Sequence, residues 1–203
     1  MEIAGDSIYI LHVDDDSDFL EVVKTFLERE DERFNIDTAT SATQGLDRVA
    51  SDHYDCIVSD YDMPGLDGVE FLQTVRNRYP DLPFILYTGK GSEEVASEAI
   101  SAGVTDYLQK ASATNQYDIL ANRITNAVDA SHSAAEAERR RRRLERFVDV
   151  VSHDLRNPLT VAQGSLELAR DECESGHIET AADAVDRSLE LIVNLLELAR
   201  QGE

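Results

Sequence analysis

Two residues of this 203-residue chain are suited by type and by surroundings to accept a phosphoryl group. Asp60 lies in the segment VSDYDMPGLDG, directly after the apolar residues 56–58. His153 lies in the segment VSHDLRNPLT, within a spacing of apolar residues that is typical of a helix. A carboxylate and an imidazole can both attack phosphorus when neighbouring groups activate them. The elements that position each residue decide whether this chemistry is available.

Asp60 belongs to a part of the chain in which strand and helix patterns alternate. Segments rich in β-forming residues occupy 8–13, 34–39, 54–59, 82–88 and 104–108, and a helical spacing follows each of them. This alternation predicts an α/β fold, a doubly wound five-stranded parallel sheet, in which ligands bind outside the carboxyl ends of the strands.

Charged and polar residues fall at those predicted strand ends. Asp14 and Asp15 end the first strand, Asp60 the third and Thr88 the fourth, while Lys110 follows the fifth. The three aspartates form an oxygen-rich pocket suited to Mg²⁺, a hard cation. Lys110, one of only three lysines in the chain, supplies the fixed positive charge that phosphoryl oxygens need.

The remainder of the chain, after about residue 126, has no strand pattern. One series of apolar residues runs through 148, 151, 155, 159, 162, 166 and 169, and a second runs through 178, 182, 185, 189, 192, 196 and 199. The break at 174–177 predicts two antiparallel helices, an all-α hairpin. A hairpin alone cannot cover both apolar seams, so we expect a homodimer that forms a four-helix bundle.

The position of His153 on its predicted helix favours a chemical role over a core role. Val151 and Leu155 are seam positions, and at about 100° per residue His153 points away from them, towards solvent. Asp154 adjoins the histidine and can polarise its imidazole. Pro158 lacks an amide donor, so we expect the helix to bend just past this site.

The composition favours a cytoplasmic protein with an acidic surface. No apolar run approaches the ~18 residues of a membrane span, and no signal-peptide pattern is present. Cys56 and Cys173 are too few and too far apart for a metal or disulfide framework. The net charge of −22 with few lysines argues against nucleic-acid binding, and it fits a salt-rich host in which repulsion is screened.

Residues 6–128 resemble the receiver domains of response regulators, which have a flavodoxin-like fold. The resemblance is carried by VDDD at 13–16, D-x-x-M-P-x-x-D-G at 60–68, ILYTG at 85–89 and Y-x-x-K at 107–110. It implies that Asp60 is the phospho-acceptor. It further implies that Asp15 binds Mg²⁺ directly, that Asp14 acts mainly through water, and that the carbonyl of Asp62 is a further metal ligand.

The same resemblance assigns roles to three residues on the later strands. It implies that Lys110 contacts the phosphoryl group, that Thr88 is a switch hydroxyl, and that Tyr107 is a switch aromatic. The sequence departs from the usual receiver pattern at Ala111, where a proline commonly follows the lysine.

Residues 140–201 resemble the dimerisation and phosphoacceptor domain of sensor histidine kinases, through FVDVVSHDLRNPLT and ELIVNLLELAR. The resemblance implies that His153 is phosphorylated, that Asp154 is its acid/base neighbour, and that Asn157 assists dephosphorylation of a partner receiver. Kinases of this type also carry an ATP-binding domain with glycine-rich loops, a pattern that this sequence lacks. We therefore expect ATP to act only through such a domain in trans or downstream.

These patterns predict three parts: a receiver at 1–128, a linking helix at 129–146, and a dimerisation and histidine phosphoacceptor domain at 147–203. The leading interpretation is a phosphorelay module of a hybrid histidine kinase, working with other two-component proteins. One alternative is a non-catalytic switch in which phosphorylation controls dimerisation and partner binding. Another is a nucleic-acid binder that uses the arginines at 139–143, although nearby glutamates can pair with them. The D-x-D at 60–62 also suggests a haloacid-dehalogenase-type phosphatase, but Met63 and Pro64 do not fit that pattern.

Overall fold

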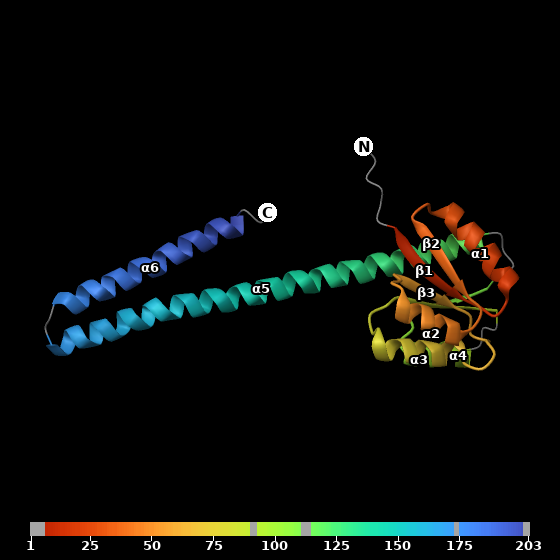
Figure 1. The fold of residues 1–203 in the computed structure, drawn as a ribbon, viewed down its shortest axis with the longest axis horizontal. Helices are drawn as coiled ribbons and strands as arrows, with labels where there is room; N and C mark the ends of the chain where they lie inside the picture. Colours follow the sequence, from red (N-terminus) through yellow and green to blue (C-terminus); the bar gives the residue numbers. More distant parts are fainter. Residues whose placement is uncertain (1–6, 90–92, 111–114, 173–174, 201–203) are drawn as a thin grey trace. The chain divides into compact units, whose positions relative to one another are not determined.

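The structure, a computed structural model, describes residues 7–89, 93–110, 115–172 and 175–200. Ala111 and Cys173, which the sequence singled out, lie outside these ranges. The chain divides into two compact units, Met1–Ala135 and Glu136–Glu203, which are treated separately below. Figure 1 shows an α/β arrangement in the first unit and a pair of helices in the second.

The first unit contains a five-stranded parallel sheet. Its strands are β1 (Ile8–Val13), β2 (Phe34–Ala39), β3 (Cys56–Ser59), β4 (Phe84–Thr88) and β5 (Asp106–Gln109). Its helices are α1 (Ser17–Glu30), α2 (Ala42–Ser51), α3 (Gly68–Arg78), α4 (Glu93–Ser101) and the first part of α5 (Gln116–Glu172). The strand order β2-β1-β3-β4-β5 confirms the predicted doubly wound sheet.

The register of the strands brings their carboxyl ends to one edge of the sheet. Val13, the last residue of β1, pairs with Ala39 of β2 and with Ser59 of β3. Thr88, the last residue of β4, pairs with Gln109 of β5. The residues that directly follow β1, β3 and β5 therefore lie near one another, and they are Asp14, Asp60 and Lys110 in turn.

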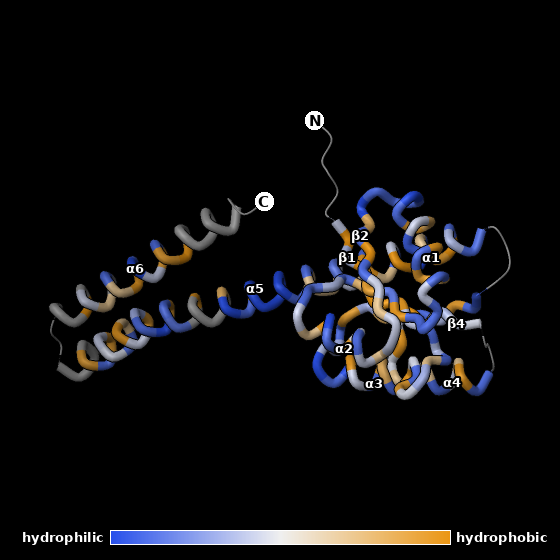
Figure 2. Tube along the Cα trace, turned by 45° about the vertical axis from the view of Figure 1, so that its right-hand side comes forward, coloured by the Kyte–Doolittle hydropathy of each residue, from blue (hydrophilic) through white to orange (hydrophobic). Residues whose placement is uncertain are grey.

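Apolar side chains bury both faces of this sheet, as expected for parallel strands covered by helices. Leu11 and Val13 of β1 pack in one cluster with Phe71 of α3. Ile10 of the same strand packs in a second cluster with Val23 of α1, because successive side chains point to opposite faces. Figure 2 shows the hydrophobic strands within the first unit and a hydrophilic middle stretch of α5.

The second unit is a helical hairpin formed by the later part of α5 and by α6 (Ser175–Arg200). The break expected at 174–177 is shorter, because Ser175, Gly176 and His177 are already helical. Serine is favoured at helix starts, and a glycine in the first turn precedes the complete hydrogen-bond ladder, so neither residue prevents helix formation there. No helix within the described ranges is both long enough and apolar enough to cross a membrane.

Small residues form the contact between the two helices of the hairpin. The buried positions are Ala162, Ser165, Ala181, Ala184 and Ser188. Larger apolar residues of the two predicted seams remain exposed, among them Leu159 at 50% and Leu189 at 54% of their surface. Among the hairpin side chains that the structure describes, the buried ones are therefore small, while several large apolar ones stay exposed.

Candidate functional site

Asp14 is a buried carboxylate at the end of β1, only 2% exposed. Its amide donates a hydrogen bond to the Ala39 carbonyl at 3.1 Å, and its Oδ1 accepts one from the Asp16 amide at 3.0 Å. Burial raises the pKa of the Asp14 carboxyl, and the charge of Asp60 adds to this rise against the opposing effect of Lys110. The site therefore holds more negative charge than its surroundings easily accommodate.

Asp60 is fixed by the backbone on both sides of its carboxylate. Its own amide donates to the Val13 carbonyl at 2.8 Å, which ties the residue to the end of β1. Its Oδ2 accepts a hydrogen bond from the Asp62 amide, also at 2.8 Å. The residue is 6% exposed, so an incoming reactant meets it at a fixed place with little freedom of orientation.

Lys110 joins the two aspartates. Its Nζ lies 2.7 Å from Asp14 Oδ2 and 2.8 Å from Asp60 Oδ1, and its amide donates to the Thr88 carbonyl at 2.8 Å. Burial alone would lower the pKa of Lys110, but its hydrogen bonds to the two carboxylates outweigh this and leave the pKa raised. The structure thus places a firmly charged ammonium beside the predicted phospho-acceptor.

Gly68 is a residue of this site that the sequence did not single out. A Cβ at this position would lie 2.2 Å from the Asp60 carbonyl oxygen and 2.9 Å from the Tyr61 Cα. The Gly68 amide donates to the Tyr61 carbonyl at 2.9 Å, and α3 begins here with a capping box between Asp67 and Glu70. The Asp-Gly pair at the end of the motif was the available signal, since only glycine permits this close approach.

The other predicted metal ligands are less tightly gathered. Asp15 is exposed in the loop after β1. In the parts of the chain that the structure describes, no three histidine, cysteine, aspartate or glutamate side chains converge as a metal-binding group. The chemistry of the donors nevertheless fits Mg²⁺, because Asp14 and Asp60 offer hard oxygen atoms and share only one ammonium between them.

The predicted switch residues occupy the buried side of the same region. Thr88 is fully buried at the end of β4. Tyr107 packs partly buried against the cluster that contains Phe71. Its hydroxyl group is buried and lacks a hydrogen-bond partner, a state shared among the described side chains only with the two ring nitrogens of His12.

Two buried residues in the strands have strongly shifted acidities. Burial lowers the pKa of His12 to about 3, with a further contribution from the charge of Lys110, so this imidazole is neutral. Sequence reasoning did not identify His12, because a run of β-forming residues does not show how completely a histidine within it is enclosed. Cys56 is a free, fully buried cysteine, and burial raises the pKa of its thiol.

His153 confirms the predicted orientation, since its side chain is 74% exposed on α5. Its Nδ1 lies 3.1 Å from Asp154 Oδ1. When Nδ1 carries the proton, it donates a hydrogen bond to that carboxylate. The lone pair on Nε2 then faces outward as a nucleophile. Asn157, one turn along the helix, is also exposed.

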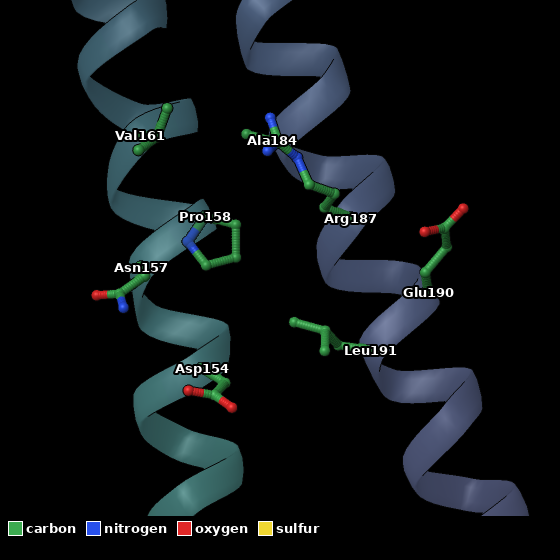
Figure 3. Close-up of a pocket in the computed structure, with 8 residues that line it drawn as sticks. All are labelled: Asp154, Asn157, Pro158, Val161, Ala184, Arg187, Glu190 and Leu191. Atoms are coloured by element: carbon green, nitrogen blue, oxygen red, sulfur yellow. The ribbon is translucent and has the colours of Figure 1, made fainter.

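A cavity of about 450 Å³ lies between α5 and α6 beside this histidine. Its lining residues are Asp154, Asn157, Pro158, Val161, Ala184, Arg187, Glu190 and Leu191. Figure 3 shows Pro158 and Leu191 directed into the space between the two helices. The helix continues on both sides of Pro158, so the expected bend at that residue stays a prediction.

The arginines at 139–143 are partly neutralised along their own helix. Glu138 accepts hydrogen bonds from Arg141 Nε at 2.9 Å and from Arg142 Nε at 2.8 Å. These bonds lower the pKa of Glu138 to about 2. Glu145 lies 3.7 Å from Arg141 on the next turn. The expected pairing of arginines with glutamates is thus present along this helix, and it favours a solvated helix over a cationic binding stripe.

The Asp60 site and the His153 site each lie in a region that matches a protein-family model. Residues 10–125 match the family model of the response regulator receiver domain. Residues 143–203 match the model of the His Kinase A phospho-acceptor domain. The two matches contain Asp60 and His153 respectively.

Curated proteins and solved structures give similarities of the same kind. The response regulator MprA of Mycobacterium bovis is 30% identical over 171 residues, covering 82% of this chain and 69% of MprA. The transcriptional regulatory protein DctD of Rhizobium meliloti is 34% identical over 107 residues, which are 53% of this chain and 22% of DctD. A crystal structure of a receiver domain protein from Clostridium thermocellum superposes with a TM-score of 0.57 at 29% identity, covering 63% of this chain and 98% of that one. This chain therefore spans only a minor part of some relatives.

Proposed function

Because the chain belongs to the response regulator receiver family and also carries a His Kinase A phospho-acceptor domain, we propose that Asp60 and His153 are its phosphorylated residues. The two domains together support two-component phosphorelay signalling, with phosphate on an aspartate and on a histidine. The observation that carries the proposal for Asp60 is its carboxylate held 2.8 Å from the Lys110 ammonium at the carboxyl edge of the sheet.

The transfer chemistry follows from the groups at each site. An oxygen of Asp60 attacks the phosphorus of a phosphohistidine in line with the P–N bond. The O–P bond forms as the P–N bond breaks, and the bonding pair returns to the histidine nitrogen. With Nδ1 protonated and facing Asp154, His153 leaves as a neutral imidazole, so no additional proton is required.

Lys110 offsets the charge that accumulates as a phosphoryl group enters this acidic pocket. Mg²⁺ held by Asp14, Asp15, Asp60 and the carbonyl of Asp62 would add positive charge for the same purpose. Thr88 and Tyr107 would then respond to the phosphorylated carboxylate as switch residues. Their burial next to the site supports this role, because a change there must displace packed side chains.

The hairpin supplies the second half of the proposal. His Kinase A domains dimerise, and the exposed apolar residues of α5 and α6 support a homodimer through this unit. Asn157 lies near His153 and would assist removal of phosphate from a docked receiver. ATP would reach His153 through an ATP-binding domain in trans or downstream.

The wider setting is proposed from the composition. We place the protein in the cytoplasm of a salt-adapted host, with other two-component proteins as partners and without nucleic acid. The proposed parts are 1–128, 129–146 and 147–203. A non-catalytic switch, in which phosphorylation of Asp60 controls dimerisation through the hairpin, is the second candidate, and the exposed apolar side chains support it equally.

Labelling experiments test both candidates. Radiolabelled acetyl phosphate with Mg²⁺ should label the wild type but not Asp60→Asn, whereas the control Asp47→Asn on the exposed face of α2 should label normally. With an ATP-binding domain added in trans, His153→Gln should remove labelling from ATP, and Asp60→Asn should trap label on His153. Label retained by Asp60→Asn in the first assay would exclude Asp60 as acceptor. An unlabelled His153 with a labelled Asp60 would favour the non-catalytic switch.

A further inference from the structure

Lys110 rests against aromatic rings in addition to its two carboxylates. Its Nζ lies 4.4 Å from the ring centroid of Phe19 and 5.9 Å from that of Tyr87. The two rings lie beside each other, with centroids 6.1 Å apart and a tilt of 31°. The ammonium therefore occupies a corner between two anionic oxygens and two aromatic faces.

Separate elements hold the ring of Phe19 in this place. The residue lies in the first turn of α1, where its amide donates a hydrogen bond to the N-capping Asp16 carboxylate at 3.1 Å. The ring of His12 on β1 meets it edge to face, with centroids 6.2 Å apart. The capped helix and the packed strand leave Phe19 little freedom to rotate.

Tyr87 is the second aromatic residue beside the Lys110 ammonium, and contacts with other elements also hold its ring in place. The residue is fully buried in β4, and its hydroxyl group donates to Gln116 Oε1 at the start of α5 at 3.0 Å. The two rings against which Lys110 lies thus come from α1 and β4, and residues of β1 and α5 contact these rings in turn. The arrangement is part of the packed unit and is not an incidental contact of one flexible side chain.

A surface of this kind matters because a lysine side chain is flexible. Its ammonium is a compact charge on four rotatable bonds, and two carboxylates can attract it in many geometries. An aromatic face attracts the cation from one further direction and excludes water from that side. The lysine side chain is 21% exposed, so this attraction is less screened than at an open surface. The contact with the aromatic rings therefore restricts the positions that the Lys110 Nζ atom can occupy.

We propose that Phe19 is a positioning residue, whose ring, supported by Tyr87, holds the Lys110 ammonium where it can bind the phosphoryl oxygens at Asp60. The inference rests on the function proposed above for Asp60 and Lys110. Phe19 itself touches no reacting atom and acts through Lys110. Its removal should slow the transfer step more than it weakens capture of a phosphodonor.

The test compares three substitutions on one helix. Phe19→Leu removes the aromatic face, Phe19→Tyr keeps it, and Phe26→Leu alters a second α1 aromatic that stacks on Tyr117, away from Lys110. With acetyl phosphate and Mg²⁺, Phe19→Leu should lower the maximal rate of labelling by about 2- to 30-fold. KM should change less than this rate, and the other two variants should stay within about twofold of the wild type.

A spectroscopic measurement reports the contact directly, without turnover. The ring of Phe19 should shift the ε-methylene proton resonances of Lys110 upfield in the wild type. The shift should persist in Phe19→Tyr and disappear in Phe19→Leu. Ordinary ε-methylene shifts in the wild-type spectrum would overturn the inference even if the leucine variant failed to fold. Unchanged labelling by a folded Phe19→Leu protein would overturn it as well.

The two proposals fail in different ways. Retention of label by Asp60→Asn would remove the proposed function, while the Lys110 resonances would still report whether the ring contact exists. Loss of label in Asp60→Asn together with wild-type rates in Phe19→Leu would remove only the role of Phe19.

Discussion

The two residues proposed to accept a phosphoryl group stand in opposite environments. Asp60 is 6% exposed, and groups from the ends of β1 and β5 and from its own loop contact its carboxylate or backbone. The His153 side chain is 74% exposed, and its contact is with Asp154, the adjacent residue. One acceptor is enclosed by its own domain, and the other is presented to solvent.

The difference in exposure indicates which reaction partners can reach each residue. The receiver holds its nucleophile and a neutralising cation in a fixed arrangement, so a small phosphodonor can react there. The hairpin presents a polarised imidazole without a comparable cationic pocket in its described part. This arrangement fits the proposal that an ATP-binding domain in trans or downstream acts on His153.

The cores of the two units differ in the size of the side chains that they bury. The sheet buries its large apolar residues on both faces, whereas the described part of the hairpin buries alanine and serine and exposes several leucine, isoleucine and valine side chains. Apolar burial is the main source of folding free energy, so the first unit satisfies this need internally. The hairpin leaves apolar surface for a second copy to cover.

Paired glycine substitutions should give the largest contrast between the units. Gly68→Ala places a methyl group against the Asp60 backbone and should cost ~3 kcal/mol or more of unfolding free energy. Gly164→Ala lies in α5 with nothing near its added methyl group. It should stabilise the hairpin by ~0.5–1 kcal/mol through helix propensity.

Chemical denaturation followed by circular dichroism would measure both effects, with acetyl phosphate labelling as a second readout. Gly68→Ala should also lose labelling, since Asp60 must shift, while Gly164→Ala should label as the wild type does. Equal stability of Gly68→Ala and wild type would show that α3 can move away from Asp60 at little cost.

A second pair of substitutions tests the exposed apolar residues. Ile192→Asp on α6 should break the homodimer, because two isoleucines leave the interface and two carboxylates enter it. The lost burial alone should raise the dissociation constant by about 100-fold or more. Ile100→Asp on α4, where the isoleucine is also exposed, should leave the dimer intact. Light scattering in concentrated salt distinguishes these outcomes, and a monomeric wild type would contradict the proposed assembly.

The buried imidazole of His12 should give the smallest effect, a pH dependence confined to the receiver. Its folded pKa of about 3 lies below the ordinary value of 6.5, so the unfolded state binds the proton first. The stability contribution is complete above pH 6.5 and is lost as the pH falls towards 3. Between pH 7 and pH 5 the wild type should lose about 2 kcal/mol more than His12→Leu.

Urea unfolding at several pH values would measure this difference. His53→Leu, at an exposed position, serves as the control for loss of an imidazole from the surface. Parallel profiles for wild type and His12→Leu would show that the His12 ring accepts a proton in the folded protein.

Much of the receiver could be predicted from the sequence, because its signals are local. Runs of β-forming residues located all five strands, although β3, β4 and β5 begin two residues later than expected. Pro83 precedes β4 and has no amide to donate, which explains one of these late starts. Asp60 and Lys110 were identified because both follow predicted strands, and the carboxyl ends of parallel strands meet at one edge of the sheet.

Other features could not be predicted, because they depend on distances between segments. The need for glycine at position 68 follows from the approach of α3 to the Tyr61 backbone. The enclosure of His12 depends on the rings packed around it. In the hairpin, periodicity identified the apolar seams but not which residues face the neighbouring helix, since alanine and serine carry a weak hydrophobic signal.

The small-residue contact between α5 and α6 also has a mechanical consequence. Methyl and hydroxymethyl groups make shallow ridges on a helix, so two such surfaces interlock weakly along their length. One helix can then slide or roll against the other without forcing long side chains through unfavourable rotamers. Such a hairpin offers little resistance to sliding of one helix along the other. A small displacement of one helix can then change the face that surrounds His153.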